Sequence, residues 1–131
     1  MENYFSISPH GQQFPLPEKN EYPAEFNRIK VLADKARSEG KEIVVVMGVG
    51  FVGAVMAAII ADTKDENGND SKFVIGCQRP SVRSYWKIPI LNQGISPVKA
   101  EDPEVDILIS RCVKEKKTLI ATYNSEVLKL A

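Results

Sequence analysis

One stretch of the chain, Glu42–Ala61, limits the fold more than any other. Its sequence is EIVVVMGVGFVGAVMAAIIA. The apolar run Ile43–Val46 predicts a strand that is buried on both faces. Gly48, Gly50 and Gly53 follow in the spacing G-x-G-x-x-G, and the apolar, alanine-rich residues after them predict a helix. The stretch therefore predicts a strand, a glycine loop and a helix in direct succession.

Each glycine of this loop has a physical task in a dinucleotide site. The first permits a tight turn out of the strand, the second lets the backbone approach a pyrophosphate, and the third lets the helix pack closely on the strand. The N-terminus of the helix offers unpaired N–H groups and the positive end of its dipole to the anion. The flanking strand and helix are the context that such a site requires. The same pattern also fits a turn without a ligand, or a site for another nucleotide such as S-adenosylmethionine.

Composition places the chain among single-domain globular proteins. It has 131 residues with 17 basic and 17 acidic side chains, and it lacks the lysine and arginine blocks that indicate nucleic acid binding. The apolar stretch Val49–Ala61 is too short to span a bilayer, and the N-terminus lacks the basic-then-apolar order of a signal peptide. Cys77 and Cys112 lie outside any C-x-x-C or metal-ligand spacing. We therefore expect a cytoplasmic protein with two reduced core cysteines and no metal, membrane or nucleic acid partner.

Residues 1–22 are rich in proline and aromatic residues, unlike the rest of the chain. This composition predicts an extended N-terminal arm followed by a domain over 23–131. Pro9, Pro15 and Pro17 disfavour a regular element in this segment, so none is predicted there. A loosely ordered tail is an equally good interpretation. Candidate anchors of the arm onto a partner surface are its aromatic residues, Tyr4, Phe5, Phe14 and Tyr22.

Helix-like and strand-like patterns alternate through the rest of the chain. Apolar residues at helical spacing mark 24–38, and Asp102-Pro103 is a strong helix start because an N-cap Asp precedes a first-turn proline. The polar stretch 62–71 predicts a turn. The other predicted elements are a second strand over 73–77, a helix over 84–91, a helical stretch to about 116, a third strand over 118–122, and a helix over 126–130 capped by Ser125.

This order predicts an α/β fold, with a Rossmann-type parallel sheet and helices on both of its faces. Three strands supply about half of a six-stranded dinucleotide fold. Three strands with both edges open are marginal alone, and the sequence ends where a further strand is expected. We therefore expect either a fragment of a longer enzyme, truncated at its C-terminus, or a half that completes its sheet by pairing.

Three segments resemble the N-terminal, nucleotide-binding domain of the UDP-glucose/GDP-mannose dehydrogenase family. VVVMGVGFVGAVMAAIIA resembles the family's opening strand, loop and helix, and TLIATYNSEVLKLA resembles its third strand and the helix after it. RSYWKIPILNQGISPVKAEDPEV resembles the segment after the second strand, with Asn92, Gly94 and Pro97 where the family has an Asn, a Gly and a Pro. The resemblance covers roughly 43–131, and the later segments make it specific because glycine loops occur in many families.

The resemblance implies the NAD-binding domain of a nucleotide-sugar dehydrogenase. Such an enzyme oxidises the primary alcohol of a UDP- or GDP-sugar to a uronate in two NAD-dependent steps, as in polysaccharide biosynthesis, and a homo-oligomer is expected. The family's catalytic cysteine belongs to a later, glycine-flanked motif that this chain does not contain. No catalytic residue is therefore assigned, and the chain by itself is expected to be inactive. The alternative is a non-catalytic nucleotide-sensing or assembly module with a Rossmann-like fold.

The resemblance also implies a set of cofactor-binding residues. Gly48, Gly50 and Gly53 match the family's glycine loop. The backbone amides of Phe51 and Val52 are then expected near the pyrophosphate of NAD.

Four further residues are implied at the adenosine end of the cofactor. Arg83 stands where the family often has a basic residue, and Thr122 stands at the end of the third strand, near the ribose. Gln78, 25 residues after Gly53, stands where the family has an Asp that binds the ribose hydroxyls. Gln78 can hydrogen-bond a hydroxyl, but it has no charge with which to repel a 2′-phosphate, and Arg79 or Arg83 can pair with that group. We expect NAD as the cofactor, with weaker exclusion of NADP than an Asp gives.

Overall fold

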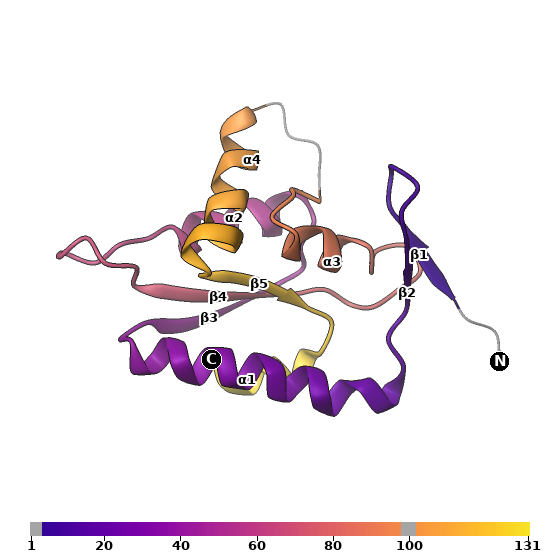
Figure 1. Ribbon diagram of the computed structural model, residues 1–131, viewed down its shortest axis with the longest axis horizontal. Coiled ribbons are helices and arrows are strands. Elements are labelled where there is room, and N and C mark those ends of the chain that lie inside the picture. The colour runs from indigo at the N-terminus through magenta and orange to yellow at the C-terminus, as the bar shows by residue number, and fades with distance from the viewer. Residues whose placement is uncertain (1–3, 98–101) are drawn as a thin grey trace.

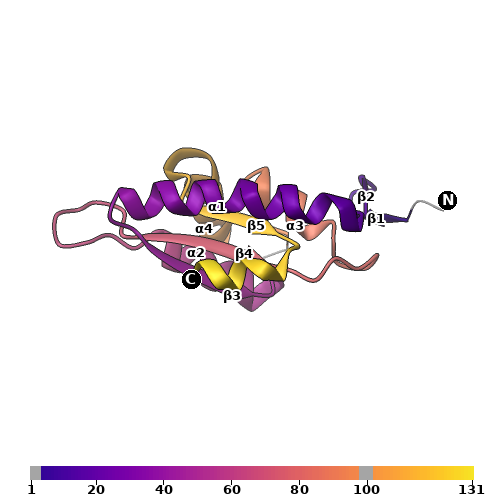
Figure 2. The same cartoon turned by 90° about the horizontal axis from the view of Figure 1, so that it is seen from below.

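The computed structural model describes residues 4–97 and 102–131, and it forms three layers. A parallel sheet of three strands lies in the middle (Figure 1). One face of the sheet is covered by one long helix together with the short C-terminal helix, which lie side by side in the view from below (Figure 2), and the other helices cover the opposite face. The predicted α/β class is therefore confirmed, and the architecture is that of a partial Rossmann-like fold.

The sheet consists of β3 (Glu42–Met47), β4 (Lys72–Cys77) and β5 (Leu119–Thr122), in that order. Val74 of the central strand aligns with Val44 on one side and with Leu119 on the other. Every residue of β4 from Phe73 to Cys77 is buried, whereas most of β3 is only half-buried or exposed. The predicted burial on both faces therefore describes β4 and is wrong for β3, because β3 is an edge strand and the helix after it lies mainly over β4.

One face of the sheet is covered by α1 (Tyr22–Ser38) and by a short 3₁₀ helix, η3 (Ser125–Leu130). Ile29, Ala33 and Ala36 of α1 are buried in the cluster that also contains Phe73 and Ile75. Their spacing of three and four residues places them on one side of the helix. The helix that the sequence predicts over 24–38 is thus confirmed, with Pro23 in its first turn.

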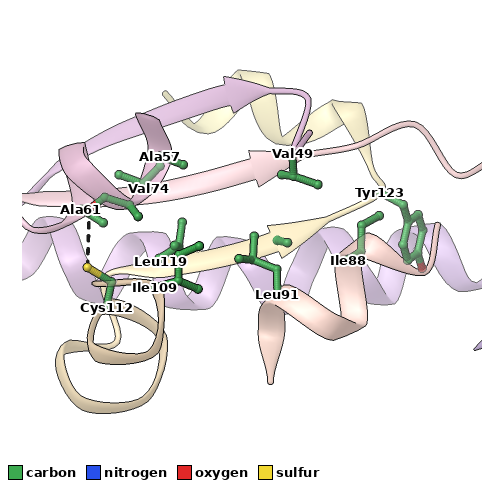
Figure 3. Packing of buried hydrophobic residues seen from close by; sticks show 12 residues of the cluster. Val49, Ala57, Ala61, Val74, Ile88, Leu91, Ile109, Cys112, Leu119 and Tyr123 are labelled. Atoms are coloured by element: carbon green, nitrogen blue, oxygen red, sulfur yellow. Dashed lines mark hydrogen bonds between the residues drawn. The ribbon is translucent and has the colours of Figure 1, made fainter. Parts of the chain in front are cut away.

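The other face is covered by α2 (Phe51–Ala61), α3 (Lys87–Asn92) and α4 (Pro103–Ser110), which continues into a π-helical stretch, η2 (Arg111–Lys116). Figure 3 shows the core between these helices and the sheet, where Ala57 and Ala61 lie close to Val74. Their small side chains let α2 approach the sheet closely. Within the described part of the chain, no helix combines the length and the apolar character needed to cross a membrane.

The side chain of Asn92 closes part of the outer edge of β5. Its Nδ2 donates a hydrogen bond to the Ala121 carbonyl at 2.9 Å, and its Oδ1 accepts one from the Ala121 amide at 2.7 Å. A carboxamide can satisfy both backbone groups because it carries a donor and an acceptor side by side. The last helical residue of α3 is thereby fastened to the sheet.

Residues 1–22 contain a two-stranded hairpin, so the prediction of no regular element in this segment is wrong. Strands β1 (Phe5–Ile7) and β2 (Gln13–Pro15) pair antiparallel. Pro9 lies in the turn and Pro15 at the end of a short strand, positions that tolerate a residue without an amide hydrogen. The hairpin is joined to the domain by a hydrogen bond of 2.9 Å from the Trp86 amide to Ser6 Oγ.

Two predicted boundaries also differ from the structure. The helix expected over 84–91 begins only at Lys87, and turns precede it. Ser84 contributes to this delay because its amide donates to the side chain of Ser81 at 3.2 Å, an alternative to helical hydrogen bonding. The expected cap of the last helix, Ser125, is also wrong, since Asn124 Oδ1 accepts from the Glu126 amide at 3.0 Å.

Asp62 is the centre of an ion-pair cluster at the C-terminal end of α2. Its carboxylate lies 3.0 Å from Arg111 and 2.9 Å from Lys116, and Lys116 also lies 2.8 Å from Asp70. Hydrogen bonds from Arg111 and Lys116 lower the pKa of Asp62 below its ordinary value. The cluster joins the end of α2 to η2.

We predict that Asp62→Asn lowers the free energy of unfolding by about 1 kcal/mol at pH 7, the upper range for a partly exposed ion pair. Because the folded state depresses the pKa of this carboxyl group, its contribution is present above the unfolded pKa of about 3.9 and is lost as the pH falls further. Urea unfolding at pH 7 and pH 3 measures the difference. Asp34→Asn, which removes an exposed pair with Lys30, is the control. An Asp62→Asn deficit that is independent of pH contradicts the prediction.

Candidate functional site

Three loops meet at the carboxyl ends of the parallel strands. The glycine loop follows β3, residues 78–86 follow β4, and residues 123–124 follow β5. Because the strands are parallel, these loops lie at one edge of the sheet, the edge toward the hairpin in Figure 1. Ligands of open α/β sheets bind in the crevice outside this edge.

Gly48 and Gly53 are required by the fold itself. Gly48 has a φ of +92°, a conformation that residues with a side chain rarely adopt. A Cβ atom on Gly53 would lie 2.1 Å from the Gly48 carbonyl oxygen, so a side chain there cannot fit without displacing backbone. These two glycines therefore perform the turn and the close helix packing that the sequence predicts.

Gly50 has no such structural reason to be a glycine. Its φ of −70° suits any residue, and a Cβ atom added there would meet no described atom within 4 Å. It stands at the N-cap of α2, where no side chain accepts a hydrogen bond from the described helix amides. The first-turn amides of Phe51 and Val52 have no intrahelical acceptor, and the sequence of this turn carries no acidic residue. Open space thus lies beside a helix N-terminus that can accept an anion.

Gln78 links the glycine loop to the loop after β4. Its Oε1 accepts a hydrogen bond from the Val49 amide at 3.0 Å, and its Nε2 donates to Ser84 Oγ at 3.3 Å. The residue lies directly after β4, as the sequence predicts, and it is half-buried. Its side chain therefore orients the backbone of the glycine loop, a role that the sequence pattern does not reveal.

Arg79 and Arg83 are exposed beside this network. Ser84 Oγ donates to the Arg79 carbonyl at 3.1 Å, and the Trp86 indole donates to the Arg83 carbonyl at 3.0 Å. Within residues 4–97 and 102–131, neither guanidinium forms an ion pair. Both backbones are thus held in the loop while both cationic side chains extend into solvent.

Thr122 lies at the end of β5 and is fully buried. Its hydroxyl donates to Glu25 Oε2 of α1 at 2.6 Å and also accepts from the Asn124 amide at 3.4 Å. The structure therefore brings Gln78 to the glycine loop, with Arg79 and Arg83 at the rim of the same edge, and it joins Thr122 to α1.

Cys77 and Cys112 are free and buried, in agreement with the expected core positions. Burial raises the pKa of both thiols, and the Asp62 carboxylate adds to the effect at Cys112. The thiolate is the nucleophilic form of cysteine. Neither residue therefore has the environment of a catalytic nucleophile.

Comparison with solved structures found a similar protein, the NDP-N-acetyl-D-galactosaminuronic acid dehydrogenase from Methanosarcina mazei Go1. The chain resembles a nucleotide-sugar dehydrogenase. The sequences are 34% identical, the TM-score is 0.54, and the match covers 69% of this chain and 18% of that structure's chain. No protein-family model and no curated protein sequence matches the chain.

The similarity supports a dehydrogenase domain of the nucleotide-sugar dehydrogenase family, and it does not reach the UDP-glucose/GDP-mannose subgroup. This chain spans less than a fifth of the neighbour's length. The partners of Gln78, Ser84 and the Val49 amide, were not predicted from the sequence. The only signal for them was the serine-rich turn after β4, which has no defined spacing.

We predict that Gly53→Ala destabilises the fold by at least about 2 kcal/mol, because its Cβ would overlap the Gly48 carbonyl oxygen. Gly50→Ala is the matched control and should cost about 1 kcal/mol or less, the difference between these residues at an N-cap. Thermal and urea unfolding of both variants provide the comparison. Equal stability of the two variants would show that α2 does not need this close approach.

Proposed function

We propose that this chain is the NAD-binding domain of a nucleotide-sugar dehydrogenase that oxidises the primary alcohol of a UDP- or GDP-sugar to a uronate. The observation that carries the proposal is Gly50, a glycine that the fold does not require, with open space where a side chain would stand. A pyrophosphate that approaches the backbone accounts for this glycine. The similarity to a nucleotide-sugar dehydrogenase supports the enzyme class.

The residues of this chain would bind and orient the cofactor. The Phe51 and Val52 amides and the dipole of α2 would hold the pyrophosphate. Gln78 would keep the loop in place through Val49, and the second lone pair of its Oε1 can accept from a ribose hydroxyl. NAD bound in this way would supply the hydride acceptor for oxidation of the alcohol carbon of the sugar.

Arg79, Arg83 and Thr122 complete the proposed adenosine end. The two arginines supply positive charge at the rim, where an adenosine phosphate can reach them. Thr122 would contribute by holding the Glu25 carboxylate, because its hydroxyl donates a hydrogen bond to that group. The proposed sugar substrate would be held by parts of the enzyme outside this chain. The enzyme would be a homo-oligomer.

The glycine loop is tested by titrating NAD into the protein and into Gly50→Ala by calorimetry. We expect the variant to bind NAD at least tenfold more weakly, because its Cβ occupies the space of the pyrophosphate, while its circular dichroism spectrum is unchanged. Thr63→Ala, in the exposed turn after α2, is the control and should bind like the parent. Unchanged affinity of a folded Gly50→Ala variant would place the cofactor elsewhere.

The proposed role of Gln78 is tested with Gln78→Glu, which keeps the reach of the side chain and its acceptor for the Val49 amide. A carboxylate adds repulsion of a 2′-phosphate, since like charges at an interface are costly. We expect the NAD-to-NADP affinity ratio to rise about tenfold, which corresponds to roughly 1.4 kcal/mol. Titration of both cofactors measures the ratio. An unchanged NAD-to-NADP affinity ratio would show that the ribose does not bind at the end of β4.

A further inference from the structure

A cavity lies at the same edge of the sheet, between the N-terminal hairpin, the segment that leads into α1 and the loops after β4 and β5. Its volume is about 730 Å³, within the range of pockets that hold small molecules. It shares no described residue with the glycine loop or with Gln78. Its aromatic and acidic lining residues are Tyr4, Phe14, Tyr85, Tyr123, Glu18 and Glu21.

Two of the aromatic lining residues, Tyr85 and Tyr123, belong to a cluster of packed rings. The Tyr123 ring packs edge-to-face against Tyr22, at 4.9 Å between centroids, and against Tyr85, at 6.0 Å. Such arrangements are favourable because the positive edge of one ring meets the negative face of another. Figure 3 shows Tyr123 at the end of the core far from Ala61 and Cys112. These rings therefore hold one another in position.

The charged side chains in the described lining of this cavity are all negative. Glu18 and Glu21 are exposed residues of the lining, and the Glu21 carboxylate accepts from the Glu18 amide at 2.5 Å. No lysine, arginine or histidine is among the described lining residues. Burial raises the pKa of Tyr123 to about 12, and the charges of Glu25 and Glu21 add to the effect; both carboxylates also raise the pKa of Tyr85. Two phenol rings therefore lie in the field of these carboxylates.

The Tyr123 hydroxyl is an unused polar group at this cavity. The residue is only 9% exposed, yet within residues 4–97 and 102–131 its hydroxyl forms no hydrogen bond. The hydroxyl is not among the buried side-chain atoms that lack a partner, so it opens onto solvent in the cavity, where water can bond to it. A guest inside the cavity can provide a partner in place of water.

We propose that this cavity binds a small organic cation of the alkylammonium class. Aromatic faces attract an ammonium group through their quadrupole, and the attraction grows when the cation is desolvated. The carboxylates of Glu18 and Glu21 supply the opposite charge, and the Tyr123 hydroxyl accepts from a polar substituent of the guest or donates to it. The site takes an organic cation and not a metal ion, because rings and prolines form most of its lining and the described residues contain no cluster of metal-ligating side chains.

The charge of the cavity separates it from the proposed dinucleotide site. Phosphate groups would meet Glu18 and Glu21 here without a compensating cation in the described lining. Arg28, the nearest guanidinium on α1, is paired with Glu25 through hydrogen bonds of 2.8 and 3.1 Å. An anionic cofactor is therefore disfavoured in the cavity that a cation fits.

The test uses choline and its uncharged isostere 3,3-dimethylbutan-1-ol, which has the same shape without the positive charge. Both are titrated into the protein and followed by protein and ligand NMR chemical shifts. We expect choline to bind at least tenfold more tightly than the alcohol, with its methyl protons shifted upfield by the aromatic rings. Equal binding of the two, or no binding of choline, overturns the proposal.

Three variants locate the site. Glu21→Gln keeps an acceptor for the Glu18 amide, and it should weaken choline binding at least threefold without changing the binding of the alcohol. Tyr85→Leu should weaken the binding of both compounds. Glu39→Gln removes an equal charge at the other end of α1, about 25 Å away, and should change neither. Insensitivity to Glu21→Gln in a folded variant overturns the proposal, as does displacement of choline by NAD, which would assign the cavity to the dinucleotide.

Discussion

The close approach of α2 to the sheet is the constraint on which the rest of the structure depends. The carbonyl oxygen of Gly48 lies within 2.1 Å of the place where a Cβ of residue 53 would stand. Farther along the helix, Ala57 and Ala61 continue this contact against Val74. Because α2 is pressed onto β4 in this way, its first amides end at the carboxyl edge of the strands. The position of a binding surface is therefore a consequence of how small side chains pack in the core.

Two regions of opposite electrostatic character share that edge. The glycine loop has the positive end of α2 and the exposed Arg79 and Arg83 near it. The cavity beside the hairpin has the carboxylates of Glu18 and Glu21. Both regions are held by short-range contacts, the first by Gln78 and the second by the edge-to-face tyrosines. One edge of a small sheet can thus offer separate environments to an anion and to a cation.

Local patterns were sufficient to predict the strand segments, α1 and the glycine loop, because the apolar runs and the glycine spacing that define each lie within a short stretch of sequence. The parallel pairing of the strands, which joins residues such as Val74 and Leu119, was inferred from the alternation of strands and helices. The contacts of the candidate site could not be predicted in the same way. Gln78 reaches Val49 across 29 residues, and Thr122 reaches Glu25 across 97. The hairpin could not be predicted because Pro9 and Pro15 are compatible with strands only in a turn or at a strand end, and the sequence does not show which amides face solvent. Side-chain roles of this kind depend on tertiary geometry, which a single sequence does not encode by spacing.

The hydrogen bonds of Asn92 have a consequence for how the sheet can grow. Its carboxamide occupies the outward-facing N–H and C=O of Ala121, which an additional strand beside β5 would need. Among the described residues, no strand lies beside the outer edge of β3. Extension of this sheet is therefore directional, since a side chain blocks part of one border and the other is available for backbone pairing. A polypeptide that lengthens the sheet meets less obstruction next to the strand that precedes the glycine loop.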